Sequence, residues 1–112
     1  MLRRDYLLRM IEEMGRMAAR IRELLLGGDV VAAETELAAA SRLAGLELQA
    51  ARALTVESLL LILRPTPTAD PGRVRIVAMI LELDAERARA AGDDEEAERA
   101  VAKARRLLGT LG

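Results

Sequence analysis

The chain contains neither cysteine nor histidine among its 112 residues. Without thiols it can form no disulfide bond and has no thiol chemistry. Without imidazole it lacks the most common general base and the most common metal ligand of proteins. Zinc sites, iron–sulfur sites and the usual di-iron site, which needs histidine beside its carboxylates, are therefore essentially excluded. We expect a protein that is not an enzyme and that holds no metal or cofactor.

Aromatic residues are almost absent as well, because tyrosine occurs once, as Tyr6, and tryptophan and phenylalanine not at all. Hydrophobic residues nevertheless make up 52% of the chain, so the core must consist of Leu, Ile, Val, Met and Ala. Alanine and leucine, like the abundant arginine and glutamate, are good helix formers. No segment shows the alternating pattern of a β-strand. The composition predicts an all-α protein.

No apolar run approaches the roughly 20 residues that a membrane-spanning helix needs. Arg3 and Arg4 lie near the start of the chain, but Asp5 and Arg9 interrupt the apolar stretch that a secretion signal would require. The length corresponds to one domain covering residues 1–112. We expect a cytoplasmic protein with no membrane partner.

The charges are nearly balanced, with a formal net charge of −1, so they do not favour a nucleic-acid partner. Arginines in the first 25 residues alternate with glutamates, which is typical of a solvated helix face with ion pairs. The arginines are Arg3, Arg4, Arg9, Arg16, Arg20 and Arg22, and the glutamates are Glu12, Glu13 and Glu23. The acidic run Asp93–Glu96 could hold Mg²⁺ or Ca²⁺. A helix N-terminus, where carboxylates meet the positive end of the helix dipole, explains it better.

The clearest pattern is an internal repeat, because the segment 28–45 recurs 64 positions later as 92–109. Nine of its eighteen positions are identical, including the Gly-Asp pair that opens each copy. Glycine ends helices and aspartate starts them, so each pair marks the turn of an antiparallel helical hairpin. We expect about five helices: hairpins at about 5–44 and 71–108, joined by a broken middle helix at 46–64. Pro65 and Pro67 end that middle segment, and Asp70 caps the next helix.

The second hairpin resembles the tetratricopeptide repeat, through Gly92, Asp93, Ala97 and Ala104. The first hairpin resembles it through Gly28, Asp29, Ala33 and Ala40. The first helix is also similar to the opening of a group of uncharacterised bacterial helical proteins, in which tetratricopeptide-like hairpins follow. The residues that carry this second resemblance are Asp5, Tyr6, Arg9, Ile11, Glu12 and Met14. Both resemblances imply a fold of helical hairpins and leave the activity open.

The first helix carries a heptad seam that includes Met10, Met14 and Met17. Such a seam is either a core or a dimer contact, and its methionines could also line an adaptable groove for a ligand or peptide. Tyr6 could anchor a partner, or pack at the edge of the core with its hydroxyl in water. Gly15 could allow another helix to approach closely.

Two segments beside the prolines are apolar on nearly all faces, more than a monomer of this size is expected to cover. We therefore expect a helical protein–protein interaction module that forms a homodimer through these segments, with the methionine seam as a secondary contact. The expected contact residues are Leu59, Leu60, Leu61, Ile62, Leu63, Val74, Val77, Met79, Ile80 and Leu83. The alternative is an adapter that binds a peptide or small ligand in a groove lined by Met and Leu.

Overall fold

A computed structural model describes residues 2–63 and 71–111, and every regular element within these ranges is an α-helix. The six helices are α1 (Leu2–Leu26), α2 (Val30–Leu43), α3 (Leu48–Ala53), α4 (Val56–Leu63), α5 (Pro71–Ala90) and α6 (Asp94–Gly109). The all-α prediction is confirmed. The count differs by one because the broken middle helix is two separate helices, with Thr55 accepting a hydrogen bond from the Ser58 amide at the break. The expectations for Pro65, Pro67 and Asp70 lie outside the described residues.

The two Gly-Asp turns have the same backbone structure. Gly28 and Gly92 adopt left-handed conformations, with φ of +79° and +82°. In both turns the glycine and aspartate amides bond back to carbonyls of the preceding helix in the Schellman pattern. The side chains of Asp29 and Asp93 then each accept a 3.0 Å hydrogen bond from the amide three residues later. The repeat is therefore a repeated turn, which reverses the chain between α1 and α2 and between α5 and α6.

The two copies of the repeat differ in backbone structure at their last position. Gly45 has a φ of +82° and ends α2 with a third Schellman turn. Gly109, its sequence counterpart, is the last residue of α6 and shows no positive φ. The difference follows from the connection, because Gly45 must turn the chain towards α3.

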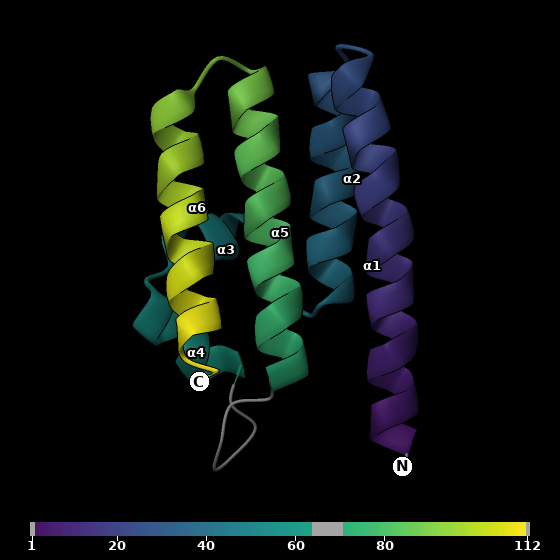
Figure 1. Cartoon of the computed structure of the whole chain (residues 1–112), viewed down its shortest axis with the longest axis vertical. Helices are drawn as coiled ribbons and strands as arrows, with labels where there is room; N and C mark the ends of the chain where they lie inside the picture. Colours follow the sequence, from purple (N-terminus) through teal and green to yellow (C-terminus); the bar gives the residue numbers. More distant parts are fainter. Residues whose placement is uncertain (1, 64–70, 112) are drawn as a thin grey trace.

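Helix α5 lies at the centre of the molecule (Figure 1). It packs against α1 and α2 on one side and against α6 on the other, while α3 and α4 lie behind α5 and α6 in this view (Figure 1). A helix surrounded in this way must be apolar on most faces. Ten of its twenty residues are buried, and nine of those ten are apolar.

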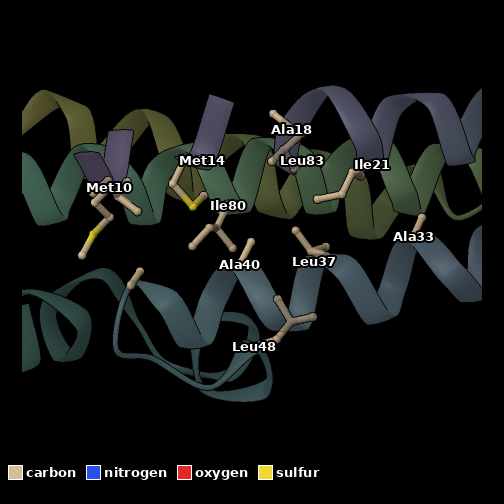
Figure 2. Close-up of a cluster of buried hydrophobic side chains, with 12 residues drawn as sticks. Met10, Met14, Ala18, Ile21, Ala33, Leu37, Ala40, Leu48, Ile80 and Leu83 are labelled. Carbon is tan, nitrogen blue, oxygen red and sulfur yellow. The ribbon is translucent and has the colours of Figure 1, made fainter. Parts of the chain in front are cut away.

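The methionine seam belongs to the core of a single chain. Met10 and Met14 are buried in a cluster where α1 meets α2 and α5 (Figure 2). Met17 is partly buried against the same cluster. The expectation that Met14 forms a contact between subunits is therefore wrong, because its own chain encloses it fully, whereas Met10 keeps 7% of its surface exposed. The structure shows no close approach of another helix at Gly15, because a Cβ atom built there meets nothing within 4 Å.

The expected contact segments are also mostly internal. Six of the ten predicted contact residues are buried within one chain, namely Leu59, Leu63, Val74, Val77, Ile80 and Leu83. Leu60 and Met79 are partly buried, whereas Leu61 and Ile62 are exposed. The six buried residues cannot form a contact surface between folded chains, because the helices of their own chain already enclose these side chains on α4 and α5.

Candidate functional site

A cluster of ion pairs surrounds Asp84, the only charged residue that is buried among those the structure describes. Asp84 comes from α5, and the residue is 1% exposed. Arg52 of α3 donates from Nη2 to Oδ1 at 2.7 Å and from Nε to Oδ2 at 3.1 Å. Arg87, one turn later on α5, donates from Nε to Oδ1 at 3.0 Å. Two guanidinium groups thus compensate the charge of one buried carboxylate.

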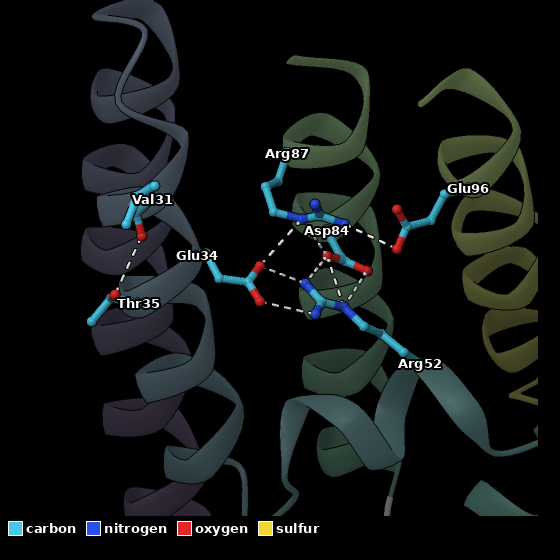
Figure 3. A network of polar contacts seen from close by, with 7 residues as sticks. All are labelled: Val31, Glu34, Thr35, Arg52, Asp84, Arg87 and Glu96. Atoms are coloured by element: carbon cyan, nitrogen blue, oxygen red, sulfur yellow. Dashed lines mark hydrogen bonds and ion pairs between the residues drawn. The ribbon is translucent and has the colours of Figure 1, made fainter. Parts of the chain in front are cut away.

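The same two arginines extend the cluster to two further helices. Arg52 also holds Glu34 of α2, with Nη1 at 2.9 Å from Oε2 and Nη2 at 2.6 Å from Oε1. Arg87 reaches Glu96 of α6, with 3.1 Å between Nη2 and Oε1. Figure 3 shows the Arg52 guanidinium between Glu34 and Asp84. The cluster therefore connects α2, α3, α5 and α6.

The electrostatics follow from this pairing. The hydrogen bonds from Arg52 are the largest cause of the lowered pKa of Glu34. Conversely, the hydrogen bonds to Glu34 hold the pKa of Arg52 above its ordinary value, against the effect of burial. Burial, the largest influence on Arg87, acts to lower its pKa, but the bonds to Asp84 and Glu96 outweigh it and the pKa is raised. Glu34, Arg52 and Arg87 are therefore all charged at neutral pH.

Lys103 of α6 lies near the cluster and caps α3. Its ammonium donates to the carbonyls of Ala51, Arg52 and Leu54 at 3.1, 2.9 and 2.8 Å. Carbonyls at a helix C-terminus lack partners within the helix and attract a cation. Burial lowers the pKa of the ammonium, with Asp84 opposing that effect. Lys103 therefore ties the short helix α3 to α6.

A small cleft of about 160 Å³ opens beside the cluster, and three of its seven lining residues belong to the cluster. Its lining comprises Arg52, Leu81, Asp84, Glu96, Arg99, Ala100 and Lys103. Among the described residues, no buried side-chain nitrogen or oxygen atom lacks a hydrogen-bond partner. No group of three or more carboxylates in residues 2–63 and 71–111 is arranged to hold a metal ion. The geometry supports a role for the cluster in holding helices together.

No sequence pattern described above predicts this cluster. The available signal was the position of Asp84, which lies three residues after Leu81 and four before Ala88, both buried. A carboxylate at the spacing of an apolar helix face needs a buried partner. The partners could not be identified from spacing, because Glu34 and Arg52 are 50 and 32 residues away.

A second feature lies along the first half of α1, where this helix and Leu43 of α2 line it together. It is a hollow of about 420 Å³, which we call the N-terminal hollow. Tyr6, Met10 and Leu43 are its apolar lining, and Tyr6 and Leu43 are 59% and 39% exposed. Its charged lining consists of Arg9, Glu12, Glu13 and Arg16. Tyr6 is therefore largely exposed and lines the hollow together with the buried core residue Met10.

No protein-family model matches this chain, and no curated protein or solved structure matches it significantly. Within the described residues, no helix is both long enough and apolar enough to cross a membrane.

Proposed function

We propose that this chain is a non-enzymatic helical interaction module that self-associates as a homodimer through the N-terminal hollow. The observation that carries the proposal is the exposure of Tyr6, the one aromatic side chain, beside the exposed Leu43. Aromatic side chains are enriched in the energetically important centres of protein interfaces. Exposed apolar surface framed by polar groups is typical of such interfaces.

The ion-pair cluster supports a binding role over a catalytic one. Asp84 is engaged with the guanidinium groups of Arg52 and Arg87, which also hold Glu34 and Glu96, so that the paired groups come from four helices. A general acid or base needs a proton-transfer group that can reach the substrate. In the cluster the charged groups are paired with one another and hold helices together, which does not suit proton transfer to a substrate.

The hairpin arrangement supports a tetratricopeptide-like module as part of the same proposal. The two hairpins turn at equivalent Gly-Asp pairs, and α5 packs against both helices of the first hairpin. Helical repeat modules commonly need at least three repeats for a self-sufficient stack. Two hairpins fall short of that number, and a second copy of the chain would add packing surface.

The second candidate function is an adapter that binds a peptide or small ligand in the N-terminal hollow. The specific observation in its favour is that Met10 and Leu43 both line the hollow, since methionine suits adaptable binding surfaces. A dimer fills the same space with a second copy, so the two functions exclude each other at this site.

Sedimentation equilibrium across the micromolar range tests the proposal. We expect a monomer–dimer equilibrium that Tyr6→Ala weakens by about tenfold, because an interface anchor contributes more than about 1 kcal/mol. Leu26→Ala is the matched control, since it removes an apolar side chain that is 89% exposed on the same helix but outside the hollow. A wild-type chain that remains monomeric throughout, or equal weakening by both variants, would contradict the proposal.

A further inference from the structure

Four residues that line the N-terminal hollow form one stripe along α1. Tyr6, Arg9, Glu13 and Arg16 are spaced by three, four and three positions. This spacing keeps side chains on one face of a helix. Glu13 is partly exposed and the other three are exposed, so the stripe faces outwards. It lies beside the buried seam of Met10 and Met14 without being part of it.

When a second copy of the stripe runs in the reverse direction, each residue of one stripe lies opposite a residue of the other with which it can interact favourably. If two copies of α1 run antiparallel about a twofold axis level with residue 11, residues equally far before and after that level face each other. Arg9 and Glu13 lie two positions before and after it, and Tyr6 and Arg16 lie five positions before and after it. A parallel pairing would instead place every charge opposite its own copy.

We propose that the second copy docks with its α1 antiparallel to the first, forming two Arg9–Glu13 ion pairs and two contacts between Arg16 and Tyr6 across the twofold axis. This inference rests on the proposed self-association and specifies its geometry. A twofold interface uses the same patch on both subunits, so the patch must be self-complementary. The charged lining of the hollow meets this requirement, with two arginines and two glutamates.

The chemistry of each contact suits its place in the stripe. Glu13 already accepts from Arg16 of its own helix, at 2.9 Å from Nε. Its carboxylate has further acceptor positions for Arg9 of the other copy. The Arg16 guanidinium, held in place by Glu13, can lie over the ring of the other Tyr6 as a cation–π contact. The ring of that Tyr6 would also cover Leu43, which lines the hollow.

Charge exchange provides a direct test of this geometry. Arg9→Glu alone places two glutamates opposite each other twice in the homodimer, and Glu13→Arg alone does the same with arginines. We expect each variant by itself to dimerise at least about tenfold more weakly than the wild type, since like-charge juxtaposition is costly. Mixed in equal amounts, the two variants can form a heterodimer in which both contacts pair a glutamate of one chain with an arginine of the other. We expect this heterodimer to form at least about tenfold more tightly than either variant alone, and somewhat more weakly than the wild type, because one of its Arg16 side chains has lost Glu13.

The outcomes separate this inference from the proposed function. The measurements are sedimentation equilibrium and native mass spectrometry, with circular dichroism to verify that both variants are folded. Arg105→Glu, the same charge change at an exposed position on α6, is the control and should leave the dimer unchanged. A wild-type dimer that resists both substitutions, or a mixture that does not recover, overturns the antiparallel geometry while self-association stands. A monomeric wild type overturns both, as does a monomer that binds only a peptide in the hollow.

Discussion

Asp84 is buried although its side chain carries a charge. A carboxylate seldom lies in a protein core unless cations and hydrogen bonds compensate its charge. Here Arg52 and Arg87 supply both. Such a cluster adds little to the net stability relative to an apolar core, but removing one partner leaves charges that the interior cannot solvate.

At this scale we predict that Asp84→Ala destabilises the fold by about 3 kcal/mol, near the low end for breaking a buried pair. The low end applies because Arg52 and Arg87 retain Glu34 and Glu96 as partners. The measurement is the free energy of unfolding from urea denaturation. Glu57→Gln is the control, since it removes an exposed ion pair with Arg106 and should leave the denaturation midpoint unchanged. Equal effects of the two substitutions would show that Asp84 is not held as described.

At the scale of the elements, the Gly-Asp turns determine how the helices are joined. The left-handed glycine allows the Schellman hydrogen bonds, and the following aspartate starts the next helix without an intervening residue. Two helices joined by so short a connection must run antiparallel. The order of hairpins in the chain is therefore set locally, by two residues in each turn.

We predict that Gly28→Ala and Gly92→Ala each destabilise the fold by about 1 kcal/mol, because a side chain disfavours the left-handed conformation. Contacts with residues elsewhere in the chain do not contribute, since a Cβ atom at either position meets none of them within 4 Å. Gly109→Ala is the matched control, also in open space but without a positive φ. Alanine should be tolerated there or be slightly stabilising. Thermal unfolding of the three variants measures the difference, and a loss at Gly109 as large as at Gly92 would contradict it.

At the scale of the whole molecule, α5 explains why the apolar segments are not an exposed interface. It packs against α1, α2, α4 and α6, and so buries the apolar face of α4 against its own side chains. Leu59 and Leu63 are fully buried in this arrangement, while Leu61 on the same helix is 71% exposed.

We accordingly predict opposite results for neighbouring leucines of α4. Leu59→Ala should destabilise the fold by about 2–5 kcal/mol, because it leaves a cavity in the core. Leu61→Ala should change the free energy of unfolding by less than about 0.5 kcal/mol, as is usual for surface substitutions. Urea denaturation compares the two variants. A large loss for Leu61→Ala would mean that this side chain is covered, contrary to its exposure.

The class of the fold, the hairpin turns and the break in the middle helix can all be predicted from the sequence. The class follows from the composition of the whole chain, whereas the turns depend on the Gly-Asp pairs and the break on Thr55 at the start of α4. The heptad spacing likewise marked Met14 as part of an apolar helix face, and this side chain is buried.

What covers each helix face depends instead on how the helices of the whole chain pack. Spacing identifies an apolar stripe but does not say whether its partner belongs to the same chain, and so the contact residues predicted from α4 and α5 were mostly core. The Asp84 cluster and the N-terminal hollow were missed for the same reason. Asp84 is paired with residues from distant helices, and the hollow exists because Leu43 of α2 lies beside Tyr6 of α1. Contacts between residues far apart in the chain depend on how whole helices pack, which no local pattern records.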